Sequence, residues 1–355
     1  MGQYIILAIT AALTGWLFDT LNVPVGWMLG PMVAGAVVSS LMKRSEPLPQ
    51  PVMRTGQALI GLGIGVDFTL ATLKQVALLG VPLVTAVVIT GALSILNGYL
   101  LCRWAGVDPA TGFVGTLPGA ASAMVVMAEE LGADPVGVTI LTYVRMVLVV
   151  LLSPLAVSIF FPGGGTGAGG AAAAAAASAV PAAPWALDVA VLLACGILGP
   201  VAGKRLHLPS SSFLGAALAI MLVSWMVPYQ FAVPQPLFNL GMLMVGLSVG
   251  MRFHLASVVR LGKAVLLEVF LVVGLIALCL GVGYFIHLVT GIDPMTAALG
   301  SAPGGMDMMT ATAAEMGGDA GVVLAMQMTR WLMVLLLGPW VATRLGRRQA
   351  AAADD

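Results

Sequence analysis

The chain has 355 residues, of which 60% are hydrophobic and 8% are charged, and its formal net charge is zero. A soluble domain carries about 25% charged residues, so this composition indicates an integral membrane protein. A DNA-binding module needs a basic, polar surface, which a neutral chain with so few charges does not provide. The 3 cysteines lie far apart and predict neither a disulfide framework nor a metal site.

Apolar segments of about 15 to 27 residues follow one another with few charges between them, as membrane helices require. The first half contains segments near residues 3–18, 25–42, 55–73, 76–102, 110–130 and 136–161. The second half contains segments near residues 186–203, 209–227, 237–251, 263–287, 295–316 and 320–343. This pattern predicts an all-helical protein that crosses the membrane many times.

The two halves repeat each other at a fixed offset, because Pro24 recurs 185 positions later as Pro209 (209 − 24). The same offset relates Gly61 to Gly246, Gly65 to Gly250, Asp108 to Asp293, Pro118 to Pro303, Glu130 to Glu315, Arg145 to Arg330 and Pro154 to Pro339. No gap is needed over roughly 130 positions, so we infer an internal duplication. The predicted parts are membrane repeats at residues 1–161 and 186–343, a linker rich in Gly, Ala and Pro at 162–185, and a tail at 344–355.

The distribution of basic residues predicts that the two repeats are inserted upside down relative to each other. Arg44 follows the second segment, whereas the matching stretch at 228–236 has no Lys or Arg. Between the first and second segments the bias reverses, because Lys204 has no basic counterpart at 19–24. Short basic loops stay cytoplasmic, so the topology is inverted and both chain termini are cytoplasmic. Inversion requires an odd number of crossings per repeat, so one segment in each repeat must enter and leave on the same side.

Segments 110–130 and 295–316 are the best candidates for this re-entrant role, because a Pro-Gly pair at Pro118 and at Pro303 interrupts them. If each second arm starts at its proline, its helix N-terminus favours a bound anion. A kinked spanning helix is the alternative. The predicted fold class is therefore an all-α integral membrane protein of two inverted-topology helical repeats, with about ten spans plus two re-entrant or broken helices, as in secondary transporters.

Arg145 and Arg330 lie about ten residues inside apolar segments, where a charged side chain is expensive and usually functional. They could face the hairpin tips and bind an anionic solute. The alternative is an internal charge pair, with Glu130 or Glu315 as the partner, that fixes helix packing. One arginine could serve both roles in different states.

Asp307 breaks the repeat, since Ser122 occupies the matching position. A carboxylate beside a hairpin tip suits a coupling H⁺ or Na⁺, and the alternative is an N-cap for its own arm. We predict no catalytic residue, metal or bound cofactor, because His207, His254 and His287 have no ligand spacing. The predicted solute site consists of Thr116, Pro118, Gly119, Ser122, Arg145, Ser301, Pro303, Gly304, Asp307 and Arg330.

The two Pro-Gly breaks, at 117–120 and 302–305, and the segments that carry Arg145 and Arg330 resemble the AbrB-duplication family of bacterial membrane proteins. The resemblance covers almost the whole chain outside the linker and the tail. It implies a multi-pass protein of the bacterial inner membrane. Members of this family carry the labels AbrB regulator of gene expression and ammonia monooxygenase, and the family is grouped by analogy with inverted-repeat secondary transporters.

These observations predict a secondary transporter that moves a small solute, leaning anionic, by alternating access. A passive channel is the alternative within transport. The family labels supply two alternatives of other classes, an indirect regulator of gene expression and an ammonia monooxygenase. We expect no enzyme activity, because such an oxygenase needs several clustered metal ligands. The expected partners are the lipid bilayer and a small-molecule solute, with no nucleic acid; a homo-oligomer stays open.

Overall fold

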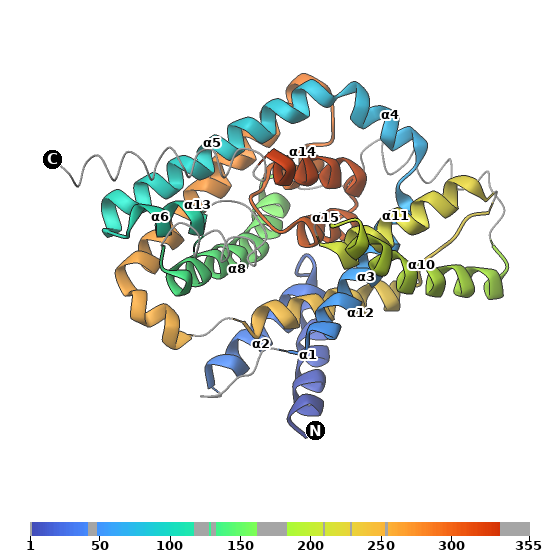
Figure 1. Ribbon diagram of the computed structural model, residues 1–355, viewed down its shortest axis with the longest axis horizontal. Helices are drawn as coiled ribbons and strands as arrows, with labels where there is room; N and C mark the ends of the chain where they lie inside the picture. The colour runs from blue at the N-terminus through green and yellow to red at the C-terminus, as the bar shows by residue number, and fades with distance from the viewer. Residues whose placement is uncertain are drawn as a thin grey trace.

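The computed structural model is helical along nearly all of the chain that it describes (Figure 1). It describes residues 2–41, 48–116, 128, 133–161, 183–208, 210–227, 229–252 and 255–333, leaving aside the side chains of 2–6, 41, 71, 75, 109, 135 and 255–261. Most of the predicted linker, at 162–182, and the predicted tail at 344–355 lie outside the described residues. The domain boundaries drawn from the sequence therefore stay predictions.

The helices follow the apolar segments closely, although the third segment of the first half divides in two. The first half holds α1 (Gly2–Thr20), α2 (Gly26–Leu41), α3 (Gln50–Asp67), α4 (Leu70–Leu78), α5 (Gly80–Ala105), α6 (Pro109–Thr116) and α8 (Pro135–Phe160). The second half holds α10 (Trp185–Arg205), α11 (Ser211–Met226), α12 (Gln235–Gly250), α13 (Leu255–Thr290), α14 (Pro294–Ser301) and α15 (Met306–Glu315). A further helix runs over residues 320–333.

Among the described residues, 4 helices are long and apolar enough to cross a membrane, and a fifth span results if the bent pair α3 and α4 counts as one. These 4 are Gly80–Ala105, Val136–Phe160, Trp185–Arg205 and Gly262–Thr290. Other apolar helices have only 10–17 residues, short of the about 20 that a full crossing needs. The described chain is thus helical, with helices long and apolar enough to cross a membrane, and the predicted ten spans stay a prediction.

The second half repeats the helices of the first at the predicted offset. The helix pair α2 and α11, and the pair α6 and α14, both begin and end 185 positions apart (211 − 26 and 294 − 109 at their starts). The turns repeat as well: Val25 before α2 has a φ angle of 58°, and Ser210 before α11 has 46°. Residues other than glycine seldom adopt a positive φ, least of all a β-branched valine. The two copies therefore share an uncommon backbone turn.

The two halves are locked together by reciprocal contacts. Helix α2 packs on α12, and its counterpart α11 packs on α3, the counterpart of α12. At these crossings Gly246 lies against the carbonyl oxygen of Met28, and Gly61 lies against that of Phe213, 185 positions from Met28. When residue i contacts j and the counterparts do the same, the two units are related by a two-fold axis. The packing between the halves is therefore pseudo-symmetric.

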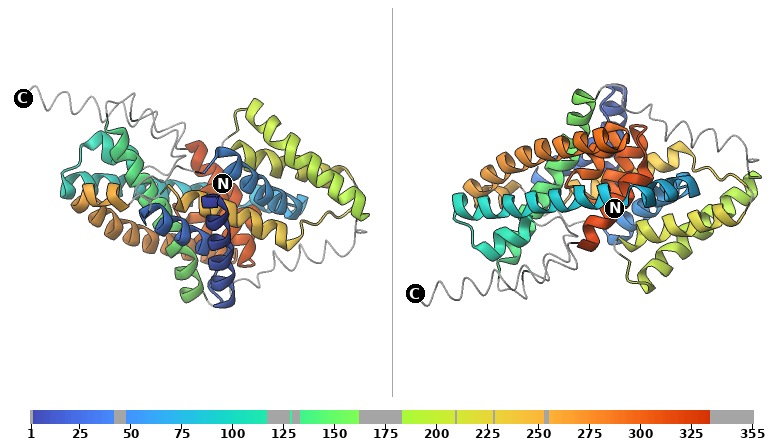
Figure 2. Two further views of the ribbon diagram at one scale, coloured as in Figure 1. Left: turned by 90° about the horizontal axis from the view of Figure 1, so that it is seen from below. Right: turned by 90° about the horizontal axis from the view of Figure 1, so that it is seen from above.

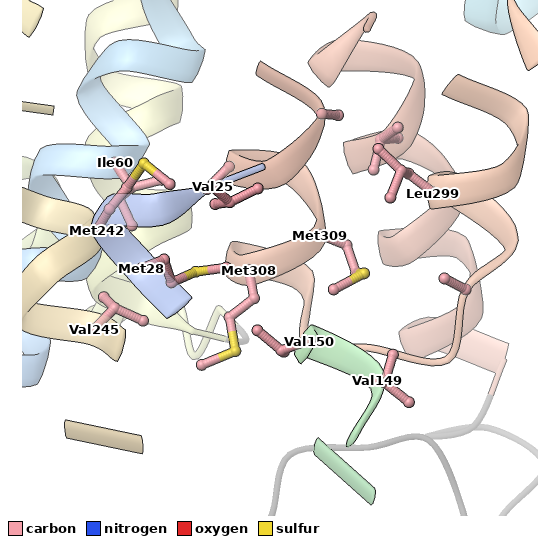
Figure 3. Packing of buried hydrophobic residues seen from close by; sticks show 14 of the residues in the cluster. Val25, Met28, Ile60, Val149, Val150, Met242, Val245, Leu299, Met308 and Met309 are labelled. Atoms are coloured by element: carbon pink, nitrogen blue, oxygen red, sulfur yellow. The ribbon is translucent and has the colours of Figure 1, made fainter. Parts of the chain in front are cut away.

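Figure 2 shows α5 and α13 lying side by side along the long axis of the molecule, and the two helices are in contact. Helices α14 and α15 lie near the centre of the molecule (Figures 1 and 2). Met308 and Met309 of α15 lie between Val25, just before α2, and Val150 of α8 (Figure 3). The broken segment α14–α15 is thus embedded in the main hydrophobic core.

We expect Gly246→Ala to lower the free energy of unfolding by about 1–3 kcal/mol, because its new methyl group would overlap backbone atoms of Met28. Gly274→Ala is the matched control, since this position in α13 has open space around it. That substitution should leave the stability unchanged or raise it by up to about 1 kcal/mol. Thermal unfolding of the detergent-purified variants measures both effects. Equal midpoints for the two variants would contradict the close crossing.

Candidate functional site

The candidate site is the break between α14 and α15, which the sequence places at Pro303-Gly304 and the structure contains. Helix α14 ends at Ser301, which is buried, and α15 begins at Met306. The second arm thus starts three residues later than predicted (306 − 303), because Ala302 and Gly305 are extended, with ψ angles of 138° and 142°. An extended residue before proline is the expected conformation. The break is a short non-helical stretch rather than a proline-initiated helix.

Side chains from the last described helix complete the hydrogen bonds that this break leaves open. The final carbonyl groups of a helix have no partner within the helix. The Gln327 amide nitrogen donates toward the carbonyl oxygens of Leu299, Gly300 and Ala302, at 3.3, 3.4 and 3.2 Å. Arg330 donates to Ala302 at 2.5 Å and to Gly304 at 2.8 Å, and also to the side-chain oxygen of Gln327.

Arg330 therefore bonds to backbone and not to the carboxylate proposed as its partner. Glu315 instead accepts a hydrogen bond of 3.4 Å from Gln235, so the predicted Arg330–Glu315 pair is wrong. A guanidinium group has five N–H donors in a fixed plane, which suits it to hold two carbonyl groups at once. Solute binding by Arg330 stays a prediction, and it would have to share these donors.

The first repeat shows part of the same arrangement. Arg145 and Thr142 both donate to the carbonyl oxygen of Gly115, each at 3.3 Å. Thr142 and Arg145 are the counterparts of Gln327 and Arg330, so both repeats place this pair of positions against the end of their short helix. Thr116, also buried, donates to carbonyl groups within α6. Pro118, Gly119, Ser122 and Glu130, which complete the first hairpin in the sequence analysis, lie outside the described residues.

Asp307 is buried in the first turn of α15. Its carboxylate accepts a 2.8 Å hydrogen bond from Gln57 of α3, whose amide nitrogen also lies 3.2 Å from the hydroxyl oxygen of Ser210. The N-cap of α15 is Gly305, so the alternative that Asp307 caps its own arm is wrong. Within the first turn, its negative charge lies at the positive end of the helix dipole, which is a favourable interaction. The carboxylate therefore occupies the place where the sequence analysis expected an anion.

Sequence reasoning missed Glu268, a carboxylate in the middle of the apolar helix α13. Its side chain is fully buried, at 0% exposure, and neither carboxylate oxygen has a hydrogen-bond partner within the described chain. It interacts electrostatically with Arg145 of α8, which packs against α13. The signal was present, since an ionisable residue interrupts a long apolar run. Its counterpart Leu83 is apolar, so a search restricted to repeated residues passes over it.

Gln57 and Ser210 were missed for the same reason. Their counterparts in the other repeat are Met242 and Val25, both apolar and buried. A polar residue that has an apolar counterpart thus marks where this duplicated chain has become asymmetric. Among the described residues, no group of 3 or more His, Cys, Asp or Glu side chains is arranged to hold a metal ion.

The structure brings several of the predicted site residues together. Ser301, Pro303, Gly304, Asp307 and Arg330 all belong to the break or bond to it. Arg145 lies close enough to Arg330 for the two positive charges to interact. Four charged side chains are buried in the described chain, and they are Arg145, Glu268, Asp307 and Arg330.

Comparison with known proteins identifies relatives over the full length of this fold. The sequence profile of the family described as "Transition state regulatory protein AbrB" matches residues 1–80 and 27–346. A protein of Escherichia coli (strain K12) named "Putative regulator AbrB" is 28% identical over 344 residues, covering 96% of this chain and 95% of that protein. "Uncharacterized protein YhjN" of Bacillus subtilis (strain 168) is 27% identical over 361 residues, covering 94% of this chain and 90% of that protein.

We expect Arg330→Met to destabilise the protein by about 1–3 kcal/mol for each carbonyl group that it leaves without a donor. The group concerned is the half-buried carbonyl of Gly304, because the carbonyl of Ala302 keeps hydrogen bonds from Gln327 and from the backbone N–H of Gly304. Arg54→Met is the matched control, because Arg54 is exposed and bonds only to the nearby side chain of Gln50. The control should change the free energy of unfolding by no more than about 0.5 kcal/mol. Similar unfolding midpoints for both variants would contradict the claim that Arg330 stabilises the helix break.

Proposed function

This chain belongs to the AbrB family, and we propose that it is a secondary transporter of a small anionic solute in a bacterial inner membrane. The observation that carries the proposal is the broken helix α14–α15, buried in the core of a membrane protein and surrounded by charged side chains. Irregular backbone and buried charge inside a membrane are costly, and they persist where they line a solute path. In secondary transporters such breaks lie between two repeats and bind the solute.

Contacts between segment ends support the inverted arrangement of the repeats. Glu315 at the end of α15 bonds to Gln235 and interacts electrostatically with Asp19. Phe161, just after α8, stacks on Tyr284 of α13 with 6.1 Å between ring centroids. An inverted topology places all five of these residues toward the outer side of the membrane. Parallel repeats that cross the membrane six times each would place Gln235 and Glu315 on opposite sides.

Alternating access requires two halves that can exchange roles, and the pseudo-symmetric packing supplies them. The reciprocal crossings of α2 with α12 and of α11 with α3 form one frame. The broken segment α14–α15 touches this frame through α3, and it also contacts α8, which lies outside the frame. We assign the frame to the fixed part of the transporter and the broken segments to the solute site.

A passive channel is the second candidate within transport, and saturable, gradient-coupled flux separates the two. The regulator named among the relatives is consistent with an indirect effect, in which transport changes a solute that other proteins sense. The label of ammonia monooxygenase predicts bound copper or iron in active protein. Stoichiometric metal in the purified protein, together with oxygenase activity, would favour that label over transport.

We predict that cysteines introduced at positions 44 and 204 are labelled from the cytoplasmic side, and one at position 232 from the outer side. The reason is the inverted topology, which places the first two positions in cytoplasmic loops and the third in an outer loop. A membrane-impermeant thiol reagent applied to intact cells and to inverted vesicles measures the sides. Replacement of Cys102, Cys195 and Cys279 provides the background. Labelling of 44 and 204 from opposite sides would overturn the inverted repeat.

We predict that a small anion raises the unfolding temperature of the purified protein, because a ligand that binds the folded state stabilises it by mass action. The panel consists of small carboxylates, phosphate, amines and Na⁺. The stabilising anion should then enter reconstituted vesicles with saturable kinetics, driven by an imposed ion gradient. Arg145→Gln should abolish both effects, whereas the exposed control Arg54→Gln should retain them. Non-saturable flux that ignores the gradient would indicate a channel.

A further inference from the structure

Helix α10 lies at the edge of the molecule (Figure 1) and has a continuous apolar face that is exposed. Its buried side packs against α11 and α3. The opposite side is exposed at every fourth position, from Val189 through Leu193, Ile197 and Val201 to Arg205. Residues four apart lie on one face of a helix. The span that contains α10 is also the least buried of the 4 candidate spans, so this face is suited to contact lipid.

This apolar face ends in a pair of basic residues. Lys204 and Arg205 belong to the last turn of α10, and both are exposed. Arg205 continues the series of Ile197 and Val201, so its side chain leaves the helix on the same face. From Ile197 to Arg205 the helix rises by about 12 Å, which is close to half of the roughly 30 Å hydrocarbon core of a bilayer. A lipid beside this face therefore has its headgroup at the level of the basic pair.

The other repeat shows that the fold does not require these two charges. Helix α1 is the counterpart of α10, and it packs against α2 as α10 packs against α11. The residues that match Lys204 and Arg205 are Asp19 and Thr20 (204 − 185 and 205 − 185). Asp19 carries a negative charge and interacts electrostatically with Glu315. The same helix end thus occurs twice in the fold, once basic and once acidic, which indicates that the basic end has a partner of its own.

We propose that Lys204 and Arg205 bind the phosphate of an anionic phospholipid, and that the acyl chains of this lipid lie along the exposed face of α10. A phosphate accepts charge-assisted hydrogen bonds from both an ammonium and a guanidinium group. Because α10 packs against α11 and α3, the bound lipid is attached to the helices that form the frame. The proposal concerns the surface that faces the membrane, so it holds for a carrier and for a channel alike.

Competition between two lipids tests this preference. The purified protein is equilibrated in micelles with equal amounts of dioleoyl phosphatidylglycerol and dioleoyl phosphatidylcholine, and native mass spectrometry counts the lipids that it retains. These lipids share their acyl chains and differ in net charge. The wild type should retain the anionic lipid preferentially. A basic residue near the membrane surface changes the affinity for anionic lipid about fivefold, so Lys204→Gln/Arg205→Gln should lower the preference roughly 30-fold.

The matched control is Arg103→Gln/Lys263→Gln, which removes two exposed basic residues from the ends of two other candidate spans. It should keep the preference, because these two charges are not paired at the end of one apolar face. Lys204→Arg/Arg205→Lys retains both positive charges and should also keep the preference. If the double glutamine variant does not fold, the single variants Lys204→Gln and Arg205→Gln should each lower the preference about fivefold.

Several results would overturn the proposal. One is a wild type without preference, and another is a preference that survives in Lys204→Gln/Arg205→Gln, as expected if the basic pair only orients the chain during insertion. An equal loss in the control variant would mean that any basic residue at the membrane surface attracts the lipid. Inorganic phosphate in excess, compared with chloride at equal ionic strength, should not displace the lipid, because it has no acyl chains. Complete displacement by phosphate would assign the basic pair to a free anion instead.

Discussion

The structure depends on one constraint, which is that a helix broken in a membrane core must have its open backbone groups bonded by protein. The last residues of α14 are buried, so their carbonyl groups need donors from within the protein. Gln327 and Arg330 bond them instead, from a helix that follows α15 in the chain. This fixes the break, and with it the buried start of α15 that holds Asp307. Arg330, which the sequence suggests as a binding group, therefore also stabilises the fold by bonding the backbone of the break.

The duplication accounts for the helix crossings between the two halves, whereas part of the candidate site consists of polar residues that are not repeated. Where the halves cross, close backbone contact recurs in both copies, as at Gly61 and Gly246. Several polar groups of the candidate site do not recur. The residues that match Gln57, Ser210 and Glu268 in the other repeat are apolar. These three polar side chains are therefore present in only one copy of an otherwise symmetric fold.

Much of this could be predicted from the sequence, for physical reasons that also explain the rest. The 185-residue offset, the interruption at Pro303-Gly304 and the buried arginines follow from residue type and spacing, and all are present. The partners of Arg330 could not be predicted, because a long side chain selects among backbone and carboxylate acceptors that only packing brings within reach. Proline suits a helix start, which predicts that α15 begins at Pro303, yet the helix begins only after the extended Gly305. Glu268 cannot be found by comparing the repeats, because its counterpart Leu83 is apolar.

Charge balance also distinguishes the two buried arginines, although they occupy matching positions. Arg330 directs its donors to carbonyl groups of the break, and these acceptors cannot lose or gain a charge. Arg145 bonds the carbonyl group of Gly115 at the end of α6, and it also interacts electrostatically with the carboxylate of Glu268 on α13. The duplication therefore places two matched arginines in different electrostatic surroundings, one against neutral backbone groups and one near a buried carboxylate.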